Sequence, residues 1–430
     1  MKKKIYLNTS VPLCFILLFS IFLPLTVVAQ DVDPFANMPT PAFKGQTNAP
    51  SVTNASRIRV TTLLNGLTAP RSLAVLPGGE VLVTEGNGSV RIIRPDGTVT
   101  VLTGMPAIRS VMGRSMNDFI LDANFAENRR VFLSYAAPPD GEPGGAKTPA
   151  DREAWTKLPE EERLAKPFQV NRIATAYLSQ DYSKLENVQI IKNNVVGRRL
   201  VSSMTGHLFI TTWGYGDQRP LVQKLNNTIG KVLRINADGT IPEDNPFVGR
   251  DDALPEIYSY GHRDPDGAFI HPDTGELWTI EHGPMGGDEL NIIRSGNNYG
   301  WAEVTYGRNY DGTSITEITQ RAGTVQPVYY WYPSVAPSGL VLYTGDLFPA
   351  WKGNIFAGTM SPTQGKFLVR LVLEGERVVA VEHLLAERDR RVRNVTQGNN
   401  GELYVLTDSE NNDQTNRHFT GEVLMLTPAN

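Results

Sequence analysis

The stretch from Gly267 to Ile293 reads "GAFIHPDTGELWTIEHGPMGGDELNII" and contains three short apolar segments. A turn centred on Gly275 separates the first two segments, and a loop rich in glycine and acidic residues separates the second from the third. Short apolar segments with β-branched and aromatic residues, bounded by Gly, Asp and Asn, are typical of antiparallel strands joined by tight turns. The stretch therefore predicts a meander of at least three strands.

The same pattern recurs along the chain. It is found in "RSLAVLPGGEVLVTEGNGSVRII", "RLVSSMTGHLFITTWGYGD", "GLVLYTGDLFPAWKGNIFAGTM" and "VRNVTQGNNGELYVLTDSE". The segments "RRVFLSYAAPP" and "NRIATAYLSQD" supply one further unit, which gives about six sheets of four strands. Long-period repeats of antiparallel meanders favour an all-β, six-bladed β-propeller, whereas a pair of β-sandwiches would not need the same hairpin so often. A charged helical segment at 149–167 is interpreted as a surface insertion.

The N-terminus has the features of an exported protein. Three lysines precede a long apolar run, and small residues around Ala29 form a cleavage site, so residues 1–29 are predicted to be a signal peptide. Residues 30–55 are predicted to be a flexible tether, and residues 56–430 the propeller. Cys14 is the only cysteine and lies inside the signal, so the mature chain has no disulfide. We expect a periplasmic or secreted protein without a membrane anchor after cleavage.

The charge of the chain argues against nucleic acid as a partner. The formal net charge is -4, and removal of the three signal lysines makes it about -7. A nucleic-acid-binding protein usually carries a basic surface, and no basic cluster is present. The expected partners are therefore small neutral molecules or cations.

The loop in "EHGPMGGDELN", residues 281–291, is a candidate cation site. Calcium prefers carboxylate and main-chain carbonyl oxygens, and the turn at Gly283 and Pro284 directs consecutive carbonyls towards one point. The alternative is a hairpin connection whose acidic side chains simply face water.

Two histidines and three arginines are candidates for the channel. His262, in "YGHRDPDG", and His282 are placed near it, although each suits a structural role as well. Arg391 and Arg393 alternate along a strand and should face the same side. With Arg263 they would form a cationic site for a ligand that carries carboxylates. The alternative is a charged edge strand.

The region "YGHRDPDGAFIHPDTGELWTIEHGPMGGDELNIIRSGNNYGW" resembles the signature of the soluble PQQ-dependent aldose sugar dehydrogenases, the glucose/sorbosone dehydrogenase family. The resemblance extends to "GLTAPRSLAVLPGGEVLVTE", "TIGKVLRINADGTIPEDNPF", "YPSVAPSGLVLYTGDLFPAWKGNIFAG" and "RRVRNVTQGNNGELYVLTD". It implies a six-bladed propeller that holds pyrroloquinoline quinone (PQQ) and calcium over its central channel. It further implies oxidation of the C1 hydroxyl of aldoses to lactones, with a small-molecule sugar as substrate and an electron acceptor as a second partner.

The resemblance also assigns residues to the cofactor site. It implies that the carbonyls of Gly283 and Pro284 bind calcium and that Arg263, Arg391 and Arg393 face the cofactor. Asp264 occupies a position where the family usually has asparagine, so it would keep a polar contact but add a negative charge.

Three family positions differ in this chain. The general-base histidine precedes a Gly-Arg-Leu motif, and "NNVVGRRLV" places Val195 there. A cofactor-side glutamine corresponds to Gly113, and a lysine corresponds to Ser361. If the chain is an enzyme, the base has moved, and His262, Asp264 and Asp266 are the candidates. The alternatives are a remodelled or non-catalytic propeller that binds a carbohydrate or another small ligand, and a propeller in which calcium is purely structural.

Overall fold

The computed structural model describes residues 38–53, 57–111, 115–410 and 419–429. The chain divides into two units, Met1–Asn37 and Met38–Asn430, and the first unit, with the predicted signal peptide, lies outside the described residues. Among the described residues, no helix is both long enough and apolar enough to cross a membrane.

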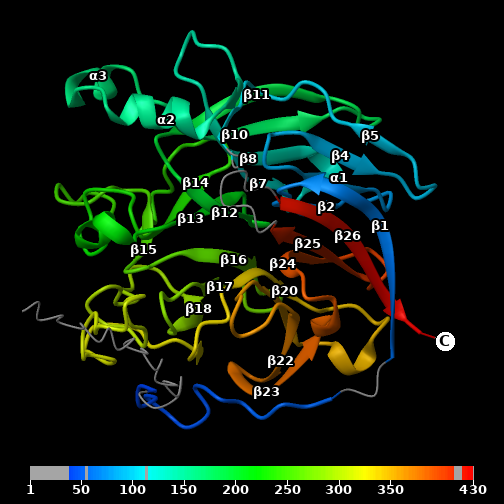
Figure 1. Cartoon of the computed structure of the whole chain (residues 1–430), viewed down its shortest axis with the longest axis vertical. Helices are drawn as coiled ribbons and strands as arrows, with labels where there is room; N and C mark the ends of the chain where they lie inside the picture. The colour runs from blue at the N-terminus through cyan, green and yellow to red at the C-terminus, as the bar shows by residue number, and fades with distance from the viewer. Residues whose placement is uncertain (1–37, 54–56, 112–114, 411–418, 430) are drawn as a thin grey trace, which may run out of the picture. The chain divides into compact units, whose positions relative to one another are not determined.

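The second unit is a six-bladed β-propeller of four-stranded antiparallel sheets, as the repeated hairpins predicted (Figure 1). Sheet 1 contains β2 (Leu73–Val75), β3 (Val81–Thr84), β4 (Val90–Ile93) and β5 (Val99–Val101). Sheet 2 contains β7 (Met116–Leu121), β8 (Arg130–Ala137), β10 (Val170–Leu178) and β11 (Leu185–Asn193). Sheet 3 contains β12 (Gly197–Ser202), β13 (His207–Thr212), β14 (Lys231–Asn236) and β15 (Ile257–Tyr260).

The second half of the propeller repeats this arrangement. Sheet 4 contains β16 (Pro265–Ile270), β17 (Leu277–Glu281), β18 (Asp288–Ile293) and β19 (Tyr329–Trp331). Sheet 5 contains β20 (Pro337–Leu342), β21 (Ile355–Thr359), β22 (Leu368–Glu374) and β23 (Arg377–Leu384). Sheet 6 contains β24 (Arg391–Gln397), β25 (Leu403–Glu410), β26 (Phe419–Pro428) and β1 (Ile58–Thr68).

Sheet 6 closes the ring because it combines both ends of the propeller. Its outer strand β1 comes from the start of the domain and pairs antiparallel with β26 at the end, so the blue and red strands lie side by side in Figure 1. Pairing the first strand with the last joins the ring through backbone hydrogen bonds, and closure of the ring protects the sheet edges.

The remaining elements lie outside the six sheets. Two short strands, β6 (Arg109–Val111) and β9 (Gly145–Lys147), pair in parallel, and the expected surface insertion forms α2 (Pro149–Thr156) and α3 (Glu160–Ala165). Thr148 caps α2 in a reciprocal capping box with Asp151. The other helices are short: α1 (Phe125–Asn128), η1 (Gly216–Leu221), η2 (Pro349–Trp351) and η3 (Ala386–Arg388).

Apolar side chains are buried between neighbouring sheets. One cluster joins sheets 3 and 4 through Phe209 and Ile293, and another joins sheets 4 and 5 through Trp278 and Ile355. Because both faces of each sheet are covered, middle strands such as β3 and β17 are buried along their whole length, whereas the outer strand β5 is exposed. This burial explains why the middle strands are nearly continuous apolar runs.

The inner strands β2, β7, β12, β16, β20 and β24 surround a central channel, each contacting the next in this order. They run in the same direction, since residues near their starts meet: Arg199 pairs with Asp118, and Ser338 donates to the Val392 carbonyl. We call the end where these strands begin the start mouth, and the end where they finish the end mouth. Loops that precede inner strands therefore converge at the start mouth.

Residues 38–53, which the sequence analysis assigned to the flexible tether, lie against sheets 4 and 5. The buried Gln46 side chain donates to the Pro327 carbonyl at 2.9 Å. Val52 N–H donates to the Val381 carbonyl at 2.8 Å, and Val381 N–H donates to the Pro50 carbonyl at 3.0 Å. This part of the chain pairs with the outer strand β23 and so covers that edge of sheet 5.

Lys231 gives the fold a testable dependence on pH. Its fully buried ammonium donates to the carbonyls of Val222 and Ile229, and burial lowers its pKa to about 7. Above that pH the unfolded chain, whose lysines titrate near pH 10, binds a proton that the folded chain does not. The free energy of unfolding should therefore receive a contribution that rises between about pH 7 and pH 10.

We expect Lys231→Met to flatten this rise, measured by urea unfolding at several pH values from 7 to 10. The exposed Lys224→Met is the control and should leave the dependence unchanged. An unaltered pH dependence in Lys231→Met would show that Lys231 keeps its proton when folded.

Candidate active site at the start mouth

The loop between β17 and β18 is held in place by one buried carboxylate. Asp288 is 0% exposed and accepts hydrogen bonds from Gly283 N–H at 2.8 Å, Ser334 Oγ at 2.8 Å, Val335 N–H at 2.7 Å and Ala336 N–H at 2.9 Å. Burial raises the pKa of Asp288, while the nearby His282 and these donors oppose that rise. The carboxylate thus joins the loop of sheet 4 to the segment that enters sheet 5.

Glycines let this loop pack without side chains. Gly287 has φ of +71°, and a Cβ there would lie 2.5 Å from the Gly307 nitrogen. A Cβ at Gly283 would lie 2.1 Å from the Gly286 carbonyl oxygen. Among the described residues, no hydrogen-bond donor reaches the carbonyl oxygens of Gly283 or Pro284. Two adjacent carbonyls therefore remain as potential ligands for a hard cation.

Arg263 lies beside this loop. Its backbone N–H donates to Glu281 Oε2 at 2.8 Å, and its Nη1 donates to the His282 carbonyl at 2.6 Å. Nη2 is 3.4 Å from the Tyr310 hydroxyl, and the buried Nε has no hydrogen-bond partner among the described residues. A buried guanidinium nitrogen without a partner is costly, so binding of a ligand oxygen that reached it would be favoured.

Aromatic rings flank the Arg263 guanidinium. Its Cζ lies 5.3 Å from the centre of the Tyr215 ring and 5.5 Å from that of Trp301, both within cation–π range. Tyr310 is 76% exposed and forms part of the rim. The start mouth therefore presents the exposed rings of Tyr215 and Tyr310 next to a positive charge, whereas Trp301 is buried.

Arg391 and Arg393 begin the inner strand β24, and both reach the buried carboxylate of Asp408. Their Nε atoms lie 2.7 Å and 3.6 Å, respectively, from its oxygens. Arg391 also lies over the Phe419 ring at 4.5 Å, and Arg393 Nη1 contacts Met360 Sδ at 2.5 Å. Asp408 therefore holds the two guanidinium groups close together at the start of β24.

Asp264 is paired with an arginine that the sequence analysis did not select. Arg198 Nε and Nη2 donate to its two carboxylate oxygens at 2.8 Å and 3.1 Å. This bidentate pair fixes Asp264 and uses both its oxygens. The extra positive charge of Arg198 therefore balances the negative charge that aspartate adds at this position.

His262, another proposed base, is fully buried, and both its ring nitrogens have partners. Its Nε2 is 2.8 Å from Ser259 Oγ, its Nδ1 is 3.2 Å from Glu281 Oε1, and its ring stacks on Tyr299. His262 therefore has a structural role just after β15.

Asp266, another proposed base, lies beside a second histidine: its Oδ2 is 3.9 Å from His282 Nε2.

His282, unlike His262, has one ring nitrogen, Nδ1, without a hydrogen-bond partner among the described residues. Its Nε2 lies 2.5 Å from the Pro337 carbonyl oxygen. A carbonyl only accepts hydrogen bonds, so Nε2 carries the proton and Nδ1 of the neutral ring keeps a lone pair. His282 was placed near the channel from the sequence but was not among the base candidates. The carbonyl that fixes its tautomer lies 55 residues away in the sequence.

A family model described as glucose/sorbosone dehydrogenase matches residues 67–416 of the chain. The chain belongs to this family. Aldose sugar dehydrogenase YliI of Escherichia coli is 34% identical over 386 residues, covering 87% of this chain and 94% of that protein. Quinoprotein glucose dehydrogenase B of Acinetobacter calcoaceticus is 24% identical, covering 82% and 86%. A crystal structure of a glucose dehydrogenase is 36% identical, covers 86% of this chain and all of that one, and has a TM-score of 0.72.

Of the three positions that differ from the family pattern, Val195 and Ser361 are buried in the structure. Val195 is 3% exposed and packs in the core cluster of sheets 2 and 3 with Phe132 and Ile173, so a histidine there would be surrounded by apolar side chains. Ser361 is buried, and its Oγ accepts a hydrogen bond from Gln364 N–H at 3.1 Å. Gly113 lies outside the described residues.

We expect Asp288→Ala to lower the free energy of unfolding by about 2–4 kcal/mol, because it leaves buried donors from two loops unpaired. Urea unfolding measures this loss. Asp273→Ala, on an exposed turn, is the matched control and should change stability by less than about 0.5 kcal/mol. Equal stability of the two variants would mean that Asp288 does not hold the loop.

Proposed function

We propose that this protein is an exported oxidoreductase that oxidises the C1 hydroxyl of aldose sugars to lactones with PQQ and calcium. The observation that carries the proposal is the arrangement at the start mouth. Two carbonyls without donors, Gly283 and Pro284, share the mouth with Arg263, whose buried Nε has no partner among the described residues. Membership of the glucose/sorbosone dehydrogenase family supports the same reading.

The residues present suit both groups. Calcium would bind the carbonyls of Gly283 and Pro284 and take its other oxygens from the cofactor and water, since the described residues contain no cluster of three or more His, Cys, Asp or Glu able to hold a metal. Arg263, Arg391 and Arg393 would bind the carboxylates of PQQ, and Asp264 would line the site through its pair with Arg198. PQQ, when bound, supplies a hydride acceptor for the sugar.

His282 is our candidate for the general base, in place of the family histidine. With Nε2–H fixed on the Pro337 carbonyl, Nδ1 is the atom that would take the proton of the C1 hydroxyl. The carboxylate of Asp266, 3.9 Å from Nε2, would stabilise the imidazolium that forms. The exposed Tyr310 ring offers a flat apolar surface for the sugar.

The second candidate is a propeller that binds a carbohydrate or similar ligand without oxidising it, calcium being structural. The observation that favours it is the buried Val195, which has no titratable group. The two functions differ in one respect only: both predict ligand and calcium binding, but only the first predicts turnover.

Calcium should stabilise the protein, since a ligand that binds only the folded state adds RT ln(1 + [L]/Kd) to the free energy of unfolding. Melting of the mature chain in millimolar calcium should occur several degrees above melting in chelator. Asp288→Ala, which releases the loop, should reduce the difference, whereas Asp273→Ala should keep it. Equal midpoints for the natural protein in calcium and in chelator would exclude a calcium site of useful affinity.

His282→Gln tests the base directly, because the glutamine amide still donates to the Pro337 carbonyl but cannot take a proton at neutral pH. With PQQ, calcium and a soluble electron acceptor, we expect kcat for aldose oxidation to fall by about 10²–10⁴-fold. His207→Gln, at the first residue of β13, should leave kcat unchanged. Full activity of His282→Gln would assign the base elsewhere, and absence of turnover in the natural protein would favour the binding function.

A further inference from the structure

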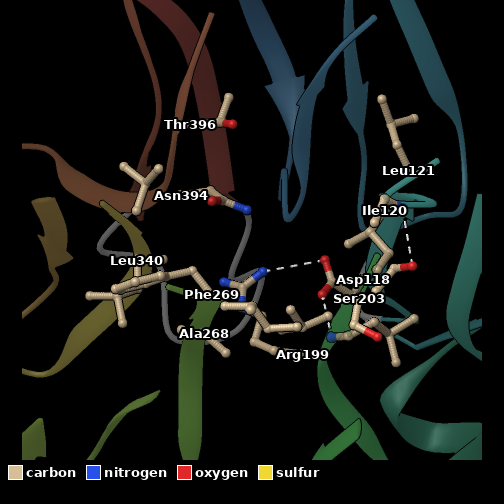
Figure 2. Close-up of a pocket in the computed structure, with 18 of the residues that line it drawn as sticks. Asp118, Ile120, Leu121, Arg199, Ser203, Ala268, Phe269, Leu340, Asn394 and Thr396 are labelled. Carbon is tan, nitrogen blue, oxygen red and sulfur yellow. Dashed lines mark hydrogen bonds and ion pairs between the residues drawn. The ribbon is translucent and has the colours of Figure 1, made fainter. Parts of the chain in front are cut away.

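A second cavity occupies the channel at the end mouth. It has a volume of about 580 Å³ and is bounded by all six inner strands and by the turns that follow β12 and β16. This volume is in the range of small-molecule sites. Figure 2 shows side chains from different sheets around this space, including Leu121, Phe269, Leu340, Asn394 and Thr396.

A layer of charged groups separates this cavity from the start mouth. Arg199 Nη1 lies 3.5 Å from Asp118 Oδ1, Nε donates to the Asp266 carbonyl at 2.7 Å, and Nη2 donates to the Arg393 carbonyl at 3.2 Å. Asp118 in turn accepts from Leu200 N–H at 2.8 Å. Arg199 and Asp118 line the cavity, so they form its floor, whereas Arg263 and the Gly283 loop are on the other side.

The floor offers hydrogen-bond donors without a net positive charge. A guanidinium has five N–H groups, and the contacts of Arg199 account for three of them. The Asn394 amide projects towards the same space and has a second N–H besides the one directed at the Arg71 carbonyl, 3.3 Å away. Asp118 and Asp266 lie 3.5 Å and 3.9 Å from the guanidinium, so two carboxylates face one positive charge and the floor is not net positive.

The walls are largely apolar. Leu121, Phe269, Leu340 and Val341 line the cavity, and Met204, 71% exposed, lies at its rim. Apolar walls favour a ring compound with little polar surface, and a flexible methionine adapts to its shape. A floor that donates hydrogen bonds but has no net positive charge favours an uncharged acceptor such as a carbonyl oxygen, because an anion would lose hydration without gaining a net opposite charge.

We propose that the cavity at the end mouth is a binding site for a neutral, mainly aromatic small molecule with a carbonyl oxygen. The oxygen accepts hydrogen bonds from Arg199 and Asn394 at the floor, and the rings pack against Phe269 and Leu340. This site is distinct from the start mouth and does not depend on the proposed dehydrogenase function.

The test uses two matched probes on the mature protein without PQQ or calcium. 2-Acetylnaphthalene is a neutral ketone, and 2-naphthoate is an anion of similar shape. Isothermal titration calorimetry should give a Kd on the order of 0.1 mM for the ketone, an ordinary affinity for a ligand of this size. We expect 2-naphthoate to bind at least about tenfold more weakly.

Two variants locate the site. Thr396→Phe fills the cavity, and Asn394→Asp keeps the acceptor oxygen that Val395 N–H uses but removes the amide donor. Each should weaken ketone binding by about tenfold or more, whereas Thr100→Phe on the exposed strand β5 should not. A melting curve for each variant checks that it is folded.

Three results would overturn the proposal: no saturable ketone binding, equal binding of ketone and anion, or unchanged ketone binding in folded Thr396→Phe. If a variant fails to fold, amide chemical-shift changes on ketone binding locate the site in the natural protein. These changes should concentrate at Phe269, Leu340 and Asn394, and changes confined to the start mouth would contradict the site.

Discussion

The position of Arg199 in the channel depends on closure of the six-sheet ring. This buried side chain starts from β12 in sheet 3 and reaches Asp118 of sheet 2, the Asp266 carbonyl of sheet 4 and the Arg393 carbonyl of sheet 6. A charge removed from water is stable only if its partners are in place, so these four sheets must keep their relative positions. The same contacts divide the channel into a polar start mouth and an apolar cavity at the end mouth.

The start mouth shows how buried charges can prepare a site. Asp288 holds the Gly283 loop through backbone donors, and Asp408 holds Arg391 and Arg393 together. These carboxylates leave the carbonyls of the loop for a ligand. The arrangement is prepared before binding, so a cofactor need not order the loop and loses less entropy when it binds.

Much of the fold was predictable because its signal is local. Alternation within the hairpin of Gly267 to Ile293 and its repetition along the chain indicated six meanders, and the charged segment at 149–167 indicated the helical insertion. The closing pair of β1 and β26 was not predicted, since it joins segments more than 350 residues apart.

The site was only partly predictable. Arg263, Arg391 and Arg393 were selected from the sequence, but their partners were not, because Asp408 and Tyr310 come from other strands and loops. The pairing of Arg198 with Asp264 likewise depends on the approach of β12 to the loop before β16. Neither the tautomer of His282 nor the burial of Val195 can be read from neighbours in the sequence, since both depend on packing between sheets.

We propose that the start mouth binds a carboxylate-bearing quinone through calcium and arginine. The most direct measurement is an absorbance titration of PQQ into the mature protein, with calcium and with chelator, for the natural chain and for Arg263→Gln. We expect saturable binding that requires calcium and is at least about tenfold weaker in Arg263→Gln. Absence of a spectral change in calcium, or equal binding by the natural chain and Arg263→Gln, would contradict it.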